Sequence, residues 1–434
     1  MPIVSGTFAV LTSSMDNLTL SSLSASLVGS EIVKLGGEIR ERIRQGEAIY
    51  NFTVGDFDPA IFPIPKGLED EIVMAYRNHF TNYPAAEGNL DLREAIRDFL
   101  DSRQHLSYQL NEILVAGGGR PLIYALFRAV CDEGDKVIYA VPSWNNNHYA
   151  NFVGARHVVV EADAAHNFMP TAAQLAPHLP GATLLALCSP QNPTGTAFSR
   201  EELSAICALV VEENEKRDAG KKLYVMFDQM YALLTYGDTV HHNPVSLHPG
   251  MRPYTIFIDA ISKAFAATGV RVGWSFGPAP VIDKMKSFMT HLGSWAPMAE
   301  QKAVAKFLPE TAAINDYLSV FKAGLELRLT RIYAGIQKLK QAGFSVDAIA
   351  PQGAIYLTVC FNLVGKTSAA GTVLDTQAAV TAYLLDEARL AVVPFFAFGA
   401  DEHSAWYRLS VGTCKEAALN QMLDQLGAAL GKLH

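Results

Sequence analysis

Seven short, nearly continuous apolar runs lie in the central part of the chain, and apolar residues recur at helical spacing in several of the segments between them. Strands that are covered on both faces need such nearly continuous apolar runs. Leu92, Ile96 and Leu100 follow the i, i+4, i+8 spacing of an amphipathic helix, and Ser199 followed by Glu202 predicts a capping box that starts another helix. This alternation predicts a mostly parallel sheet with crossover helices. The expected strands are 113–116, 136–140, 157–160, 183–188, 223–227, 255–258 and 271–276.

The two ends of the chain carry a different pattern. The first 30 residues are rich in Ser, Thr and Leu, and a charged helical stretch follows them. A long charged helix begins near residue 309 and leads into two further strand candidates, 355–361 and 406–411. We therefore expect an α/β protein with a large domain, built on a mostly parallel seven-stranded sheet flanked by helices, and a smaller α+β domain formed by both chain ends. The predicted boundaries are 1–30 for an N-terminal arm, 63–308 for the large domain, and 31–62 with 309–434 for the small domain.

Composition limits the class of protein and its partners. Half of the 434 residues are apolar and 18% are charged, which excludes a disordered chain and leaves room for two or three domains. A net charge of −8 without a basic block argues against nucleic acid or an anionic membrane as a partner. No apolar run approaches the roughly 20 residues that span a bilayer, and the first basic residue is Lys34, which argues against a signal peptide. The five cysteines form no CxxC pair, which favours reduced thiols and a cytoplasmic location.

Several short motifs match a known site in part and fail on context. Gly117–Gly119 cannot begin a GxGxxG dinucleotide loop, because Leu122 occupies the last glycine position. The sequence around Ser275 reads GxSxG, but Pro278 interrupts the strand–turn–helix context that a nucleophilic serine needs, so we interpret it as the end of a strand. His241 and its neighbour have no third ligand at a metal-binding spacing, and no metal is predicted.

Polar residues that follow the predicted strands form a more informative group. Gly117–Arg120 follows the first strand, and glycines at that place let a helix N-terminus approach a phosphate. Asp228 follows a later strand, with Tyr231 three residues on, and Lys263 follows the next. Ligands bind beyond the carboxyl ends of the strands in open parallel sheets, so these residues are candidates for one site. Each has an ordinary structural explanation alone, and the prediction depends on their occurring together in this order.

Five segments between Val54 and Val411 occur together in an order that is typical of one known family. They are Asn82-Tyr83-Pro84 with Gly88 and Leu92-Arg93-Glu94-Ala95-Ile96, Pro142-Ser143-Trp144, Ser189-Pro190-Gln191-Asn192-Pro193-Thr194-Gly195, Ser262-Lys263, and Gly269-Val270-Arg271-Val272-Gly273. In these segments the chain resembles the class I/II aminotransferases of the aspartate aminotransferase superfamily (fold type I), which depend on pyridoxal 5′-phosphate (PLP). Ala260, three residues before Lys263, departs from the Gly or Ser that is usual there.

The resemblance implies a role for each candidate residue. It assigns the covalent attachment of PLP, and then the work of a general base, to Lys263, and it places Asp228 beside the protonated pyridine nitrogen. Arg408 would bind the substrate α-carboxylate bidentately, helped by a backbone N–H of Gly55 and by Asn192. The remaining implied contacts to the cofactor are Tyr231 and Asn192 to the phenolic oxygen, Trp144 to the ring face, Gly118, Gly119, Arg120, Ser262 and Arg271 to the phosphate, and Tyr83 to the phosphate of the neighbouring subunit.

The implied reaction is transamination between an L-amino acid and a 2-oxo acid, in two half-reactions that alternate PLP with pyridoxamine phosphate. Tyr83 in its implied role requires a homodimer with shared active sites. Arg120 favours an aspartate/glutamate-type substrate with 2-oxoglutarate as acceptor, although it could equally be a surface charge or a phosphate neighbour. Phe395, Phe396 and Phe398 could favour apolar substrates but are more easily explained as core. A PLP-dependent lyase, decarboxylase or synthase on the same scaffold is the alternative, since fold does not decide the reaction.

Overall fold

A seven-stranded, mostly parallel sheet forms the centre of the protein. The structure is a computed structural model that describes residues 20–27, 29, 31–218 and 220–434. The strands lie in the order β2-β8-β7-β6-β5-β3-β4, and only β8 runs antiparallel to its neighbours. The sequence prediction of this sheet is confirmed. Its strands are β2 (Ile113–Ala116), β3 (Lys136–Val141), β4 (Arg156–Glu161), β5 (Ala182–Cys188), β6 (Tyr224–Asp228), β7 (Thr255–Ala260) and β8 (Gly273–Phe276).

Helices cover both faces of this sheet and bury a separate apolar core on each. On one face, Leu122 and Leu126 of α5 and Met285 of α11 pack against alternate strand residues such as Met226 and Ile258. The opposite core is larger and continues under the second sheet, with α4 and α8 among the helices that contribute to it. The helices of this region are α3 (Lys66–Arg77), α4 (Leu90–Gln104), α5 (Gly119–Val130), α6 (Asn146–Phe152), α7 (Ala172–Leu175), α8 (Arg200–Glu215), α9 (Pro244–Leu247), α10 (Ile261–Ala264), α11 (Ala279–Leu292) and α12 (Met298–Phe307).

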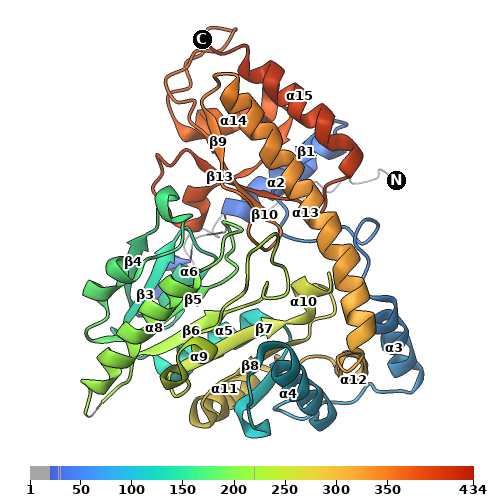
Figure 1. The fold of residues 1–434 in the computed structure, drawn as a ribbon, viewed down its shortest axis with the longest axis vertical. Helices are drawn as coiled ribbons and strands as arrows, with labels where there is room; N and C mark the ends of the chain where they lie inside the picture. Colours follow the sequence, from blue (N-terminus) through green and yellow to red (C-terminus); the bar gives the residue numbers. More distant parts are fainter. Residues whose placement is uncertain (1–19, 28, 30, 219) are drawn as a thin grey trace, which may run out of the picture.

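A second sheet is built from the C-terminal part of the chain. Its four strands lie in the order β12-β13-β10-β9 and are antiparallel, and a short parallel pair, β1 with β11, joins the N-terminal region to it. Figure 1 shows the long helix α13 running from this part down along the side of the seven-stranded sheet. Its elements are α1 (Ser22–Ser26), α2 (Glu31–Arg44), β1 (Tyr50–Asn51), α13 (Thr311–Gln341), β9 (Val346–Ala348), β10 (Tyr356–Phe361), α14 (Gln377–Glu387), β11 (Leu390–Ala391), β12 (Val393–Pro394), β13 (Trp406–Ser410) and α15 (Leu419–Leu430).

Three local expectations need comment. Residues 1–19, 28 and 30 of the predicted arm lie outside the described residues. The last strand of the large sheet begins at Gly273, not at residue 271, because Arg271 has a left-handed backbone with φ of 60° that cannot continue a strand. The capping box is half right, since the Ser199 hydroxyl accepts the Glu202 N–H at 3.1 Å, whereas the Glu202 carboxylate accepts the N–H of Ala172.

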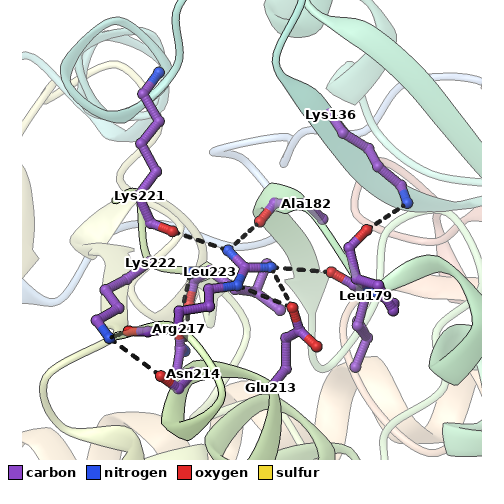
Figure 2. A network of polar contacts seen from close by, with 10 residues as sticks. Lys136, Leu179, Ala182, Glu213, Asn214, Arg217, Lys221, Lys222 and Leu223 are labelled. Carbon is purple, nitrogen blue, oxygen red and sulfur yellow. Dashed lines mark hydrogen bonds and ion pairs between the residues drawn. The ribbon is translucent and has the colours of Figure 1, made fainter. Parts of the chain in front are cut away.

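A network of polar contacts fixes the connection from α8 to β6 (Figure 2). Arg217 donates to Glu213 at 2.7 Å, to the carbonyl of Ala182 at 2.7 Å and to the carbonyl of Leu179 at 3.1 Å. Asn214 bonds both backbone groups of Leu223, at 2.9 and 2.7 Å. The network satisfies loop carbonyls that would otherwise be partly buried without donors, and it holds the amino end of the sheet, away from the strand ends where ligands bind.

Replacing Arg217 with alanine is expected to lower the free energy of unfolding by about 2 kcal/mol, because the partly buried Glu213 carboxylate and the loop carbonyls lose their donor. The measurement is the midpoint of thermal unfolding. Lys216→Ala is the matched control: its ion pair with Glu212 is exposed, so its removal should change the midpoint much less. Equal decreases of the unfolding midpoint in the two variants would contradict the stabilising role of the network.

Two further features concern only the described residues. None of their helices combines the length and apolar character needed to span a membrane. Nor do their His, Cys, Asp and Glu side chains gather in a group of three or more that could hold a metal ion.

Candidate active site

A cavity of about 630 Å³ opens at the carboxyl ends of the strands of the large sheet. Parts of the chain that are far apart in sequence meet there, because the N-terminal loop after β1 and strands β10 and β13 of the second sheet lie over those strand ends (Figure 1). Most of the residues predicted for the site line this cavity. They are Gly55, Gly119, Arg120, Trp144, Asn192, Asp228, Tyr231, Ser262, Lys263, Arg271 and Arg408.

Lys263 lies in α10, the short helix that directly follows β7, and its half-buried side chain forms part of the cavity wall. Its Nζ donates a hydrogen bond to the carbonyl of Gly55 at 2.6 Å. Burial lowers the pKa of Lys263 to about 8, and the positive charge of Arg408 acts in the same direction, while Asp56 opposes it. A lysine with this pKa is partly uncharged near neutral pH, so its amine can act as a nucleophile or as a base.

Asp228 ends β6 with its carboxylate facing the cavity. One of its oxygens accepts the N–H of Met230 at 3.0 Å, and the carboxylate forms no ion pair within the described part of the chain. Burial raises its pKa to about 6. A buried carboxylate without a cationic partner is costly, so this position fits a ligand that brings a protonated ring nitrogen.

The loop that follows β5 supplies Asn192, whose side-chain oxygen accepts a hydrogen bond from Arg408 at 3.2 Å. The loop closes with Gly195, which has φ of 70° and lies against the Tyr356 carbonyl, so a side chain would find neither the backbone conformation nor the space. The carbonyl of Gly195 accepts the N–H of Gly353 at 2.9 Å. The loop is thereby joined to the second sheet, and Asn192 is brought to Arg408.

Arg408 projects from β13 and is only 1% exposed. It donates to the carbonyl of Thr53 at 2.7 Å, and its guanidinium carbon lies 4.8 Å from the ring centre of Tyr356 and 4.9 Å from that of Phe398. Its Nε is buried and has no hydrogen-bond partner within the described chain. A buried guanidinium that is held between two rings and has an unused donor is suited to bind a carboxylate bidentately.

Backbone groups and one arginine form a cradle for an anion at the start of α5. Gly118 has φ of 98°, and a Cβ there would lie 2.8 Å from the Arg271 guanidinium carbon, so only glycine fits. Arg271 is held by the carbonyls of Gly117 at 2.8 Å and Thr268 at 2.7 Å. With the hydroxyl of Ser262 also on the cavity wall, this end of the site fits a phosphate at a helix N-terminus.

Trp144 and Arg120 lie together at another part of the wall. The Arg120 guanidinium carbon lies 5.3 Å from the ring centre of Trp144, the side chain is exposed, and it makes no ion pair with any described residue. Arg120 is therefore a cation of the site whose charge is not neutralised by the protein around it.

Among the predicted site residues, Gly118 of the cradle and Tyr83 do not line this cavity, and Tyr83 lies on the surface. It is 83% exposed and packs against Trp295, with ring centres 5.5 Å apart, beside a separate surface groove. A side chain in this position cannot serve its own chain's cavity, and its predicted contact with a neighbouring subunit stays a prediction. Ser275 lies fully buried within β8, so a nucleophilic serine at that motif is excluded.

The structure adds cavity residues that the motifs did not identify. Thr268 donates its hydroxyl hydrogen bond to Asp56 at 2.6 Å, and both line the cavity. Asp56 directly follows Gly55 and Thr268 directly precedes Gly269, so extending the matched motifs by one residue could have identified both. Tyr356 also lines the cavity, and no motif marks it, since it is the first residue of an apolar strand.

Comparison with solved structures identifies the class of protein. The structure is similar to that of aspartate aminotransferase from Rhizobium meliloti, with a TM-score of 0.88 and 28% identity over 96% of this chain and 100% of that chain. It is also similar to aspartate aminotransferase from Thermus thermophilus with maleate, with a TM-score of 0.83 and 26% identity over 95% of this chain and 100% of that chain. The protein has the fold type I architecture of these enzymes.

Comparison of sequences gives the family. Aspartate aminotransferase of Rhizobium meliloti (strain 1021) is 28% identical over 419 residues, which is 95% of this chain and 96% of the relative. Residues 47–426 match the profile of the family described as aminotransferase class I and II. The chain belongs to this family of aminotransferases, which use PLP. The family and the aminotransferase function predicted from the motifs are thereby confirmed.

Proposed function

We propose that this protein transfers an amino group between an L-amino acid and a 2-oxo acid, in two half-reactions, with PLP held in the cavity at the carboxyl ends of the large sheet. One observation carries the proposal: the half-buried amine of Lys263 shares this cavity with the Asp228 carboxylate, which forms no ion pair with the described residues, and with the Arg408 Nε, which has no hydrogen-bond partner among them. When bound, PLP supplies an electron sink that stabilises negative charge developing at the substrate Cα.

The residues present fit the cofactor group by group. Asp228 would keep the pyridine nitrogen protonated, Tyr231 and Asn192 would bond the phenolic oxygen, and Trp144 would cover the ring face. The anion cradle would hold the phosphate through the backbone of Gly118, Gly119 and Arg120 and the side chains of Ser262 and Arg271, which leaves the Arg120 side chain free for the substrate. Tyr83 of a second copy would complete the phosphate site, so the proposal includes a homodimer.

The substrate would lie between the amine and the arginine. Arg408 binds its α-carboxylate, with the Gly55 N–H and the Asn192 amide as neighbours, and this fixes the Cα–H bond beside Lys263. The Lys263 amine would take the proton from Cα and pass it on without returning it to Cα, as the change from amino acid to oxo acid requires, and its lowered pKa suits this work. The division into a cofactor domain at 63–308 and a smaller domain with Arg408 remains part of the proposal, as does a cytoplasmic location.

The proposed substrates are dicarboxylic, of the aspartate/glutamate type with 2-oxoglutarate as acceptor. Arg120 is an exposed cavity cation that forms no ion pair with the residues the structure describes, and a second carboxylate would neutralise it. The names of the relatives support this choice, since they are aspartate aminotransferases and one structure is titled with maleate, a dicarboxylate.

Replacing Arg120 with alanine is expected to raise the KM for aspartate and glutamate about tenfold, because one charge-assisted hydrogen bond is lost. The KM for the donors alanine and phenylalanine should stay within about twofold of the wild-type value. The measurement is glutamate formation from 2-oxoglutarate across a donor panel, and aspartate formation from oxaloacetate when glutamate is the donor. Arg128→Ala, an exposed arginine further along α5, is the matched control.

Two outcomes would contradict these proposals separately. An equal loss for every donor in Arg120→Ala would place Arg120 at the phosphate. Failure of the wild type to form glutamate with any donor, while another product of the amino acid accumulates, would favour the lyase, decarboxylase or synthase alternative.

A further inference from the structure

Tyr356 makes two contacts in the cavity that no motif accounts for. Its hydroxyl lies 2.7 Å from the hydroxyl of Tyr231, and the two rings are 5.6 Å apart at 72°. The face of the same ring lies 4.8 Å from the guanidinium carbon of Arg408. One side chain thus touches both a residue proposed for the cofactor and the residue proposed for the substrate carboxylate.

The surroundings leave Tyr356 little freedom. It is 1% exposed, and a Cβ on Gly55 would lie 2.9 Å from its hydroxyl oxygen. The strand that it begins is tied to the Asn192 loop, because the Thr358 hydroxyl donates to the carbonyl of Thr194 at 2.7 Å. Because its neighbours hold the side chain in this way, the Tyr356 hydroxyl has a fixed position relative to Tyr231. The hydrogen bond between the two hydroxyls is therefore a stable part of the site.

The direction of that hydrogen bond matters. Burial raises the pKa of both tyrosines, so each hydroxyl keeps its single proton at neutral pH. If Tyr231 donated to Tyr356, it would have no proton left for a ligand in the cavity. If Tyr356 donates, the Tyr231 proton points to the ligand, and the accepted hydrogen bond makes Tyr231 a stronger donor.

We infer that Tyr356 is a positioning residue that donates its hydroxyl proton to Tyr231, directs the Tyr231 proton toward the phenolic oxygen of the cofactor, and holds the Arg408 guanidinium with its ring. This inference rests on the proposed function, in which Tyr231 bonds that oxygen. It separates the two parts of the side chain: the hydroxyl serves the cofactor and the ring serves the substrate carboxylate.

The test is a pH titration of the visible absorbance of the purified holoenzyme. A donor to the phenolic oxygen favours the deprotonated chromophore and so lowers the midpoint. Tyr356→Phe is expected to raise the midpoint by about half a pH unit, a threefold change in the proton equilibrium, and to leave the KM for the amino donor within about twofold. Tyr356→Leu, which also loses the ring, is expected to raise that KM about tenfold.

Tyr231→Phe and the double variant complete the experiment. Tyr231→Phe should raise the midpoint by more than Tyr356→Phe does, and adding Tyr356→Phe to it should change nothing further. Tyr407→Phe is the matched control, because that buried hydroxyl bonds Gln377 at 2.9 Å instead of a cavity residue, and its midpoint should equal that of the wild type.

The outcomes are distinct. A lowered or unchanged midpoint in Tyr356→Phe, with Tyr231→Phe still effective, overturns the inference and leaves the proposed function in place. A KM rise in Tyr356→Phe as large as in Tyr356→Leu assigns the hydroxyl to the substrate and also overturns it. No shift in Tyr231→Phe removes Tyr231 from the cofactor, and the proposed site then fails with it.

Discussion

Replacing Lys263 with alanine is expected to abolish the visible absorbance of the holoenzyme and to lower transamination by about 10⁴-fold or more. Two contributions are lost together, the covalent anchor of the cofactor and the base that moves the Cα proton. The structure gives a reason why other lysines are poor substitutes: among the described residues, Lys263 is the lysine that lines the cavity, at the carboxyl end of β7, and burial lowers its pKa to about 8.

The measurement has two parts. The first is the absorbance spectrum and activity of the variant, beside Lys284→Ala, whose exposed lysine on α11 pairs only with Asp283 and should leave both unchanged. The second is borohydride reduction of the wild-type holoenzyme and mass spectrometry of its peptides, which should locate the cofactor mass on Lys263. A persistent absorbance band in Lys263→Ala, or the added mass on another lysine, would show that the anchor is misassigned.

Replacing Arg408 with lysine is expected to raise the KM about 100-fold for every amino donor, with a smaller effect on kcat. Lysine keeps the charge but cannot form two parallel hydrogen bonds to a carboxylate, and a charged hydrogen bond lost in a buried site costs about 1.5–3 kcal/mol. Every amino acid carries the α-carboxylate, so acidic and apolar donors should be affected alike.

Arg328→Lys is the matched control for this change. Arg328 is also buried, donates to the carbonyl of Cys414 at 2.8 Å and lies over the ring of Phe62, but it does not line the cavity. Its substitution should lower the midpoint of thermal unfolding and leave KM unchanged. If Arg408→Lys impaired acidic donors only, Arg408 would bind the side-chain carboxylate and not the α-carboxylate.

The fold was largely predictable from local sequence. Most strands of the large sheet are apolar runs bounded by polar or turn residues, and such runs indicate burial on both faces. The edge strand β4 is an exception, since only Val160 of its three valines is buried. Strands that the sequence did not predict are short: β1 and β11 have two residues each, too few for any periodicity, and they form because a distant segment provides the partner strand. The sequence predicts Arg271 as part of a strand because its neighbours are apolar. Its left-handed backbone, which accompanies the contact of its guanidinium with Gly118, has no signal in that local pattern.

The candidate site was predictable where motif residues follow strands, since the carboxyl ends of parallel strands necessarily meet at one edge of the sheet. Asp228 and Lys263 belong to this group. Tyr356 does not, because it begins a strand of another sheet, and its place in the cavity depends on how the two sheets lie against each other. Tyr83 illustrates the same limit, since its motif is clear but its side chain lies outside its own chain's cavity.

The sequence by itself determined the alternation of strands and helices, the family, and the identity of the residues at the strand ends, because each of these depends on neighbours within a few positions along the chain. Only the tertiary structure decided how those residues are charged and paired. Burial from distant segments lowers the pKa of Lys263 and raises that of Asp228, and packing of the second sheet brings Arg408 to Asn192 and Tyr356 to Tyr231. Desolvation and contact depend on everything that surrounds a group in space, and no local pattern in the chain records that.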